Sequence, residues 1–142
     1  MIITNAVKYD RITGMKPFVY YLATLVALVV LDGLWLGVVA KSFYKEHLGA
    51  LFRADFVWLA IVAFYILYAA AIVYFVVLPA EGLWVKALLG GILLGFTTYM
   101  TYDLVNYATL KDWPLAVVLA DIAWGCVVTG AAATVATLAG GL

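Results

Sequence analysis

Four long apolar stretches, separated by short polar segments, divide the chain. They cover residues 17–40, 56–78, 87–108 and 114–138. As helices they would be about 33–38 Å long at 1.5 Å per residue, enough to cross a hydrocarbon core of about 30 Å. Short connections make consecutive helices antiparallel. The pattern therefore predicts an all-α membrane protein, a four-transmembrane-helix antiparallel bundle.

The polar segments differ in character. Between the first two spans, Tyr44, Leu48, Leu51 and Phe52 recur at helical spacing, and the charged residues fall elsewhere, which predicts a short interfacial helix. Residues 1–16 are mixed polar without periodicity, so we interpret them as an N-terminal tail in which Met15 resembles a second start. We expect residues 17–142 to form a single membrane domain.

Composition agrees with a membrane location and limits the chemistry. The chain of 142 residues is 68% hydrophobic and 11% charged, whereas soluble domains are about half apolar and a quarter charged. We expect a multi-pass membrane protein. Zero net charge argues against nucleic acid as a partner, since phosphate binding needs clustered basic residues. One cysteine and one histidine leave no disulfide framework and no bis-histidine haem site, and we predict no cofactor.

Three aspartates lie inside the apolar spans. Asp32 is eight residues before the end of the first span, Asp103 is near the end of the third, and Asp121 is seven residues after Pro114. In an antiparallel bundle these ends face one side of the membrane, so each carboxyl lies about 9–12 Å below that surface. Carboxylates in a hydrocarbon environment are costly and mark functional sites. We therefore predict that the three aspartates share one half-buried pocket.

Polar and aromatic residues accompany each aspartate at helical spacing, so that they share its face. The predicted ligand-binding residues are three acids, two indoles, three phenols and one amide: Asp32, Trp35, Tyr99, Tyr102, Asp103, Asn106, Tyr107, Asp121 and Trp124. Desolvation and like-charge proximity lead us to expect at least one carboxyl protonated at neutral pH. No metal site is predicted; any metal would have the three aspartates as its ligands.

The motifs that carry these residues resemble those of an uncharacterised family of small bacterial integral membrane proteins, a domain of unknown function. They are D-x-x-W-L-G from Asp32, Y-D-x-x-N-x-A-T-L from Tyr102 and D-x-x-W-G from Asp121. The resemblance runs from Met15 onward, implies a location in a bacterial inner (plasma) membrane and implies no particular activity. A membrane carboxylate beside aromatic residues in a four-helix protein is also similar, by analogy only, to the small multidrug resistance transporters.

Three functions remain open. The first is binding or transport of a small cation or cationic amphiphile, linked to protons, because an acid beside an indole suits an ammonium group. The second is a membrane enzyme acting on a lipid or isoprenoid, and the third is a structural accessory subunit. Membrane lipids are expected partners.

Glycines in the first and third spans predict close helix packing and a homo-oligomer. The pairs are Gly33 with Gly37, and Gly90-Gly91 with Gly95. Lysine and arginine do not settle the orientation, since four lie on the terminal side and four on the pocket side: Lys8, Arg11, Lys16 and Lys86 against Lys41, Lys45, Arg53 and Lys111.

Overall fold

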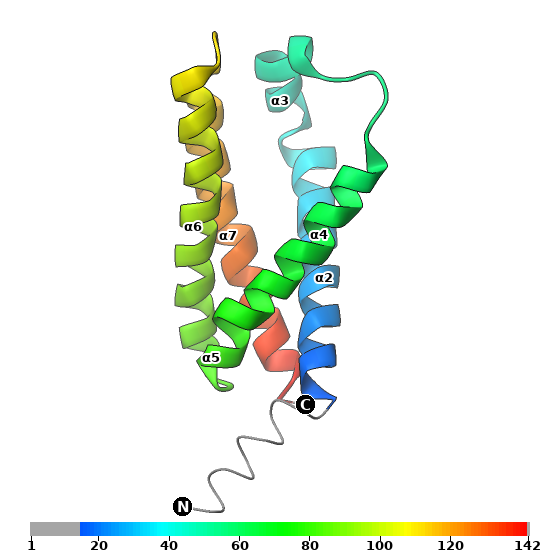
Figure 1. The fold of residues 1–142 in the computed structure, drawn as a ribbon, viewed down its shortest axis with the longest axis vertical. Coiled ribbons are helices and arrows are strands. Elements are labelled where there is room, and N and C mark those ends of the chain that lie inside the picture. Colours follow the sequence, from blue (N-terminus) through cyan, green and yellow to red (C-terminus); the bar gives the residue numbers. More distant parts are fainter. Residues whose placement is uncertain (1–14, 142) are drawn as a thin grey trace, which may run out of the picture.

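A computed structural model describes residues 15–141 as a bundle of four long helices (Figure 1). The predicted tail lies outside the described residues except for Met15 and Lys16. The elements in chain order are α2 (Lys16–Leu34), the π-helical η1 (Trp35–Val39), α3 (Lys41–Leu48), the 3-10 helix η2 (Gly49–Leu51), α4 (Trp58–Ile72), the π-helical η3 (Val73–Val77), α5 (Leu78–Ala80), α6 (Trp84–Thr109) and α7 (Leu115–Ala139).

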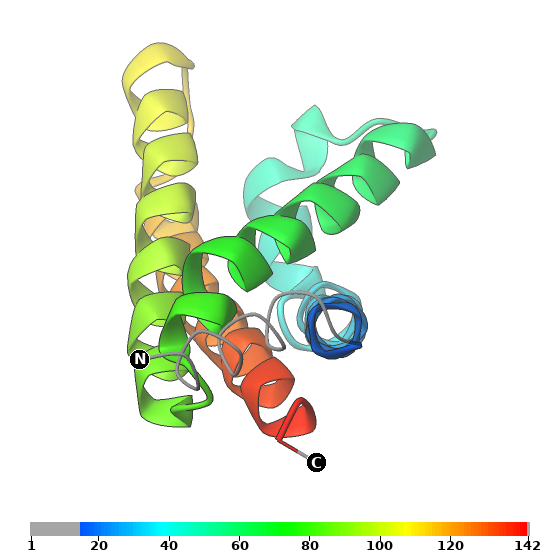
Figure 2. The same cartoon turned by 60° about the horizontal axis from the view of Figure 1, so that its bottom comes forward.

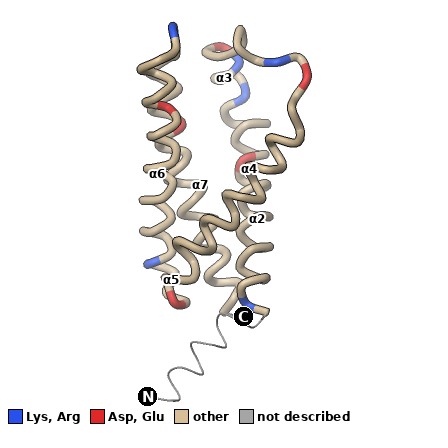
Figure 3. Tube along the Cα trace, in the orientation of Figure 1, with Lys and Arg blue, Asp and Glu red and all other residues tan. Residues whose placement is uncertain are grey.

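The predicted fold class is confirmed. Four helical segments are long and apolar enough to span a membrane: Lys16–Val39, Trp58–Ala80, Trp84–Thr109 and Leu115–Ala139. No strand occurs within residues 15–141, and the short helix α3 follows the first span, as the amphipathic pattern predicts. Lysine and arginine gather at the two ends of the bundle, with acidic positions also inside its length (Figure 3). The chain is therefore an integral, multi-pass membrane protein.

Glycines bring α6 and α7 into the most extensive helix contact of the bundle. A Cβ atom added to Gly95 would lie 2.0 Å from the carbonyl oxygen of Gly125, and one on Gly91 would lie 2.7 Å from that of Thr129. Only hydrogen fits at these positions, so the two backbones touch. Close approach through small residues is how membrane helices associate without a hydrophobic driving force between them.

The second span crosses the bundle obliquely. In both Figure 1 and Figure 2, α4 begins well away from α6 and ends beside it. Its first part packs mainly against α2, whereas η3 also contacts α6 and α7. The Tyr68 hydroxyl joins α4 to both helices, lying 3.0 Å from the Thr98 Oγ1 and 2.8 Å from the Thr129 Oγ1. Beyond this junction, toward α3, α4 diverges from the α6–α7 pair.

The glycines of the first span do not make the close contact predicted from their spacing. Within the described chain, no atom of another element lies within 4 Å of a Cβ built on Gly33 or Gly37. The small-xxx-small interpretation is therefore wrong for packing inside this bundle, because both glycines face outward. The pattern was correct for Gly91 and Gly95, which face α7. Homo-oligomerisation stays a prediction.

We expect Gly95→Ala to destabilise the bundle by about 1–3 kcal/mol, the usual cost of overpacking, because the new methyl group must push α6 away from α7. The measurement is the midpoint of thermal unfolding in detergent. Gly33→Ala is the control, since its methyl group meets open space. Equal midpoints for the two variants would contradict the close contact between α6 and α7.

Candidate functional site

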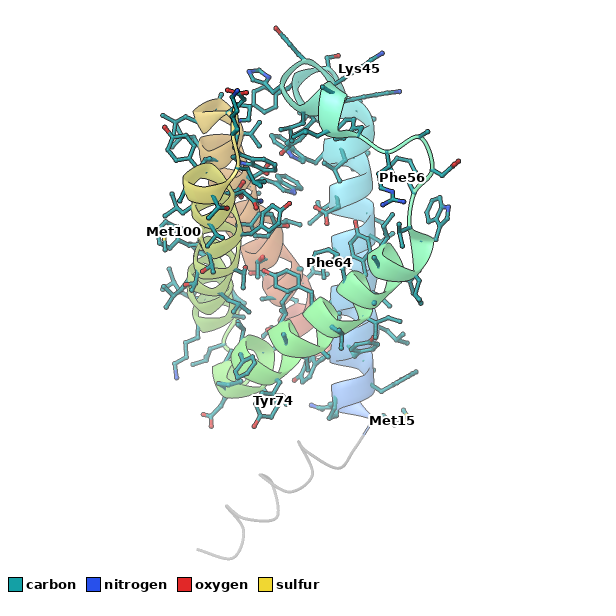
Figure 4. The ribbon with its side chains drawn as sticks, turned by 45° about the horizontal axis from the view of Figure 1, so that its top comes forward. Met15, Lys45, Phe56, Phe64, Tyr74 and Met100 are labelled. Atoms are coloured by element: carbon teal, nitrogen blue, oxygen red, sulfur yellow. The ribbon has the colours of Figure 1, made fainter. Side chains whose placement is uncertain are left out.

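Two adjoining cavities, of about 700 and 600 Å³, occupy the region where α4 diverges from α6 and α7. Both are lined by Leu36, Phe64, Tyr99, Tyr102 and Asp121, so together they form one cleft. The first cavity adds Asp32, Tyr44, Ala60, Ile61, Tyr65 and Trp124, and the second adds Tyr68, Thr98 and Asp103. Every long helix contributes to the walls, and Phe64 lies on α4 at mid-length (Figure 4).

A stacked pair of indoles connects η1, which continues α2, to α7 beside the cleft. The rings of Trp35 and Trp124 lie 4.5 Å apart, centroid to centroid, with an angle of 4° between their planes. The Trp124 Nε1–H donates to Asp32 Oδ1 at 2.8 Å. Asp32 is only 4% exposed, and Tyr65 of α4 lies beside it. The carboxyl of α2 is thus held by an indole of α7.

Asp121 is held from the opposite direction. The Trp35 Nε1–H donates to the Tyr44 hydroxyl at 3.2 Å, and this hydroxyl in turn donates to Asp121 Oδ1. Tyr44 belongs to α3, outside the spans. Burial and the hydrogen bond to Asp121 raise the pKa of Tyr44 above its usual value near 10. The phenol therefore remains a hydrogen-bond donor throughout the physiological pH range.

Asp103 has no such support. Its side chain is fully buried, and neither carboxyl oxygen has a hydrogen-bond partner within residues 15–141. The Trp113 indole lies close by without reaching hydrogen-bond geometry, so its N–H also lacks an acceptor in the described chain, as does the Asn106 amide nitrogen. An unpaired buried carboxyl is costly, and this one lines the second cavity.

The structure brings together most of the residues predicted for the site. Asp121 lines both cavities, Asp32 the first and Asp103 the second, with Tyr99 and Tyr102 common to both. Of the remaining predicted residues, Trp124 lines the first cavity, and Trp35 stacks on Trp124 without lining either cavity. Asn106 and Tyr107 do not line the cleft. Tyr107 is half exposed on the outside of the bundle. The pocket is therefore two connected chambers with Asp121 between them.

Several lining residues were not among those predicted. The sequence pattern predicts that Tyr44 lies on the apolar face of the interfacial helix. In the structure this face turns toward the cleft, and Tyr44 is buried. Phe64 and Tyr65 belong to a span without charge, where nothing in the sequence distinguishes the cleft side from the lipid side. Only the tyrosines of this span could have been predicted to face the bundle interior from the sequence, since a buried phenol needs a hydrogen-bond partner.

The cleft is acidic and contains no counter-charge from its own walls. Among the described residues, no lysine, arginine or histidine lines either cavity. Nor do residues 15–141 gather three or more His, Cys, Asp or Glu side chains closely enough to hold a metal ion. Asp32, Asp103 and Asp121 share the cleft without forming a set of metal ligands. The arrangement suits a ligand that carries its own positive charge.

Comparison with known proteins identifies the family. The family model described as Predicted membrane protein (DUF2177) matches residues 17–138, and the chain belongs to this family. Its function is unknown. No curated protein and no solved structure matches the chain.

The bridge through Tyr44 generates a stability prediction. Tyr44→Phe removes the donor to Asp121 and the acceptor for Trp35, so we expect the free energy of unfolding to fall by about 1–2 kcal/mol. Denaturation by SDS in mixed micelles measures the change. Tyr74→Phe is the matched control, because Tyr74 is exposed at the other end of the bundle. Equal stability of the two variants would contradict the bridge.

The raised pKa of Tyr44 also predicts a pH dependence. The folded pKa lies above the unfolded value near 10, so the stabilisation by this phenol is complete below pH 10 and is lost as the pH rises further. The stability difference between wild type and Tyr44→Phe should stay constant from pH 8 to about 10 and then shrink by about 1.4 kcal/mol per pH unit. The same SDS titration, repeated at each pH, tests this, and a difference that grows above pH 10 would refute it.

Proposed function

We propose that this DUF2177 protein binds or transports a small cation or a cationic amphiphile in the cleft, in exchange for a proton. One observation carries the proposal. Asp103 is fully buried, both of its oxygens lack a partner among the described residues, and it lines a cavity whose walls include no basic side chain. A ligand with a positive charge would supply what this carboxyl lacks.

The cleft walls suit an organic cation. Phe64, Tyr99 and Tyr102 line both chambers, and aromatic faces attract ammonium groups through the ring quadrupole. A volume of 600–700 Å³ per chamber is of the size that small-molecule sites use, about 300–1,000 Å³. A bare metal ion would use neither the aromatic walls nor this volume.

The cleft also offers room for an apolar tail. Leu36, Phe64 and Tyr102 line it and are nevertheless exposed, at 51%, 43% and 61% respectively. This surface belongs to spanning segments, so the exposed portions meet lipid chains. A cationic amphiphile could place its head at Asp103 and leave its tail in the bilayer.

The location of the acid supports the proposed proton exchange. A carboxylate within a spanning segment is costly, and without a hydrogen-bond donor it is stabilised by taking up a proton or a counter-cation. Because a proton and a ligand cation compete for the same oxygens of Asp103, binding of one releases the other. Such competition is the minimum that a proton-linked transporter needs, and it is equally useful to a pH-dependent binding protein.

A structural role is the second candidate, supported by the hydrogen bonds of the other two acids. Asp32 accepts from Trp124, and Asp121 accepts from Tyr44, so each joins elements far apart in the sequence. These acids would stabilise the bundle whether or not a ligand binds. The lipid-enzyme alternative gains less support, because the described carboxyls do not gather into a metal-binding group. Substitution of Asp103 therefore distinguishes ligand binding from a structural role.

Asp103→Asn should abolish binding of tetraphenylphosphonium, a lipophilic cation, whereas the wild type should bind it more tightly as the pH rises. Equilibrium dialysis of the purified protein in detergent measures binding, and an indicator dye measures the protons released. The matched control is Asp112→Asn at the exposed turn, where the left-handed backbone (φ 61°) also accepts asparagine.

The outcomes separate the candidates. Loss of binding in Asp103→Asn alone supports the cation site. Undiminished, pH-dependent binding in Asp103→Asn would refute the proposal. A wild-type protein that binds no cation, while Asp32→Asn and Asp121→Asn lower its stability, would favour the structural role.

A further inference from the structure

A third cavity lies outside the acidic cleft, at the end of the bundle where α3 turns back toward α4. Its volume is about 790 Å³, and it is enclosed by the end of the first span, by α3 and by the connection that follows. Its lining residues are Leu36, Lys41, Tyr44, Lys45, Gly49, Ala50, Phe52 and Phe56. Figure 4 shows Lys45 on α3 and Phe56 on the connection to α4.

Two lysines give this cavity a positive charge. Lys41 and Lys45 are four residues apart on α3, so they share one helix face. No acidic residue of the described chain lines the cavity, although Glu46 lies on α3 itself and Asp55 on the following connection. The cavity is therefore opposite in charge to the acidic cleft, and it suits an anion.

The other walls are apolar. Leu36 belongs to a spanning segment, whereas Phe52 and Phe56 lie in the connection and are more than half exposed. The cavity thus extends from the polar end of the bundle to the beginning of the hydrocarbon region. A free anion would contact only the lysines and leave the two phenylalanines in water.

We propose that this cavity binds an anionic phospholipid, with its phosphate on Lys41 and Lys45 and its acyl chains along Leu36, Phe52 and Phe56. Lysine binds phosphate as a point charge, and basic pockets at the ends of membrane helices bind anionic lipid headgroups. Charge complementarity and the apolar walls together select this ligand over a free anion or a zwitterionic lipid.

The lipid would also influence the neighbouring cleft. Leu36 and Tyr44 line both this cavity and the first chamber of the cleft, and Tyr44 holds Asp121. A lipid seated against α3 would stabilise the position of the Tyr44 hydroxyl. The lipid site itself rests on Lys41 and Lys45, so it stands or falls independently of cation binding at Asp103.

Native mass spectrometry of the full chain in detergent, titrated with phosphatidylglycerol, tests the proposal. We expect phosphatidylglycerol to bind and Lys41→Gln/Lys45→Gln to weaken its affinity about tenfold or more. The single variant Lys45→Gln should show an intermediate loss. The matched control is Lys86→Gln/Lys111→Gln, which removes the same charge from exposed positions outside the cavity.

Specific results would overturn the lipid site. Equal losses in the two double variants would mean that general attraction, not this cavity, holds the lipid. Equal binding of phosphatidylcholine would refute selection by charge. Displacement of phosphatidylglycerol by millimolar inorganic phosphate alone would assign the lysines to a free anion. Thermal unfolding midpoints within a degree or two of wild type would show that the double variant is folded, and otherwise the single variant decides.

Discussion

The backbone contact between α6 and α7 is the constraint on which the site depends. Lipid chains are as apolar as the helix surfaces, so burial of apolar area cannot hold these helices together. Gly91 and Gly95 instead let α6 touch the backbone of α7 directly. This contact places Asp103 and Asp121, one from each helix, on the same cavity. A larger side chain at the contact would separate the helices and with them the two acids.

The direction of the helices determines which acid each tryptophan of the two D-x-x-W motifs reaches. Because α2 and α7 run antiparallel, the tryptophan three residues after each aspartate points back toward the acid of the opposite helix. Trp124 reaches Asp32 directly, and Trp35 reaches Asp121 through Tyr44. The stacking of the two rings restricts their rotation and so helps to hold each indole N–H on its own acceptor. Two copies of one short motif thus supply hydrogen bonds to each other's acids, the buried Asp32 and the partly buried Asp121, without any basic side chain among these partners.

The sequence predicted the features that follow from length, polarity and helical rise. Four spans, the short helix after the first span and the placement of three aspartates near one end all rest on local counting. The partners of those aspartates could not be predicted, because they depend on how helices rotate and tilt against one another. Tyr44 illustrates the difficulty, since its spacing places it on the apolar face of α3 but does not say what that face covers.

The rotation of a helix about its own axis is also why Gly33 and Gly37 make no close contact within the bundle. The same spacing of small residues that brings α6 to α7 occurs in the first span, yet Gly33 of α2 and Gly37 of η1 face outward. Spacing shows that a helix can be approached closely, whereas the other helices decide whether it is. The oblique α4, joined to α6 and α7 through Tyr68, approaches the α6–α7 pair at one end only, and the cleft opens at the other.

The three acids therefore play different parts despite their similar positions in the sequence. Asp32 and Asp121 have neutral donors, and a neutral donor stabilises a carboxyl without cancelling its charge. Asp103 has no donor in hydrogen-bond geometry among the described residues, although the unpaired N–H groups of Asn106 and Trp113 are buried in the same region. In a purely structural cluster these groups would be expected to pair, because each unpaired buried polar group costs about 1–3 kcal/mol. A positively charged ligand at Asp103 would offset this cost, which a purely structural role leaves unexplained.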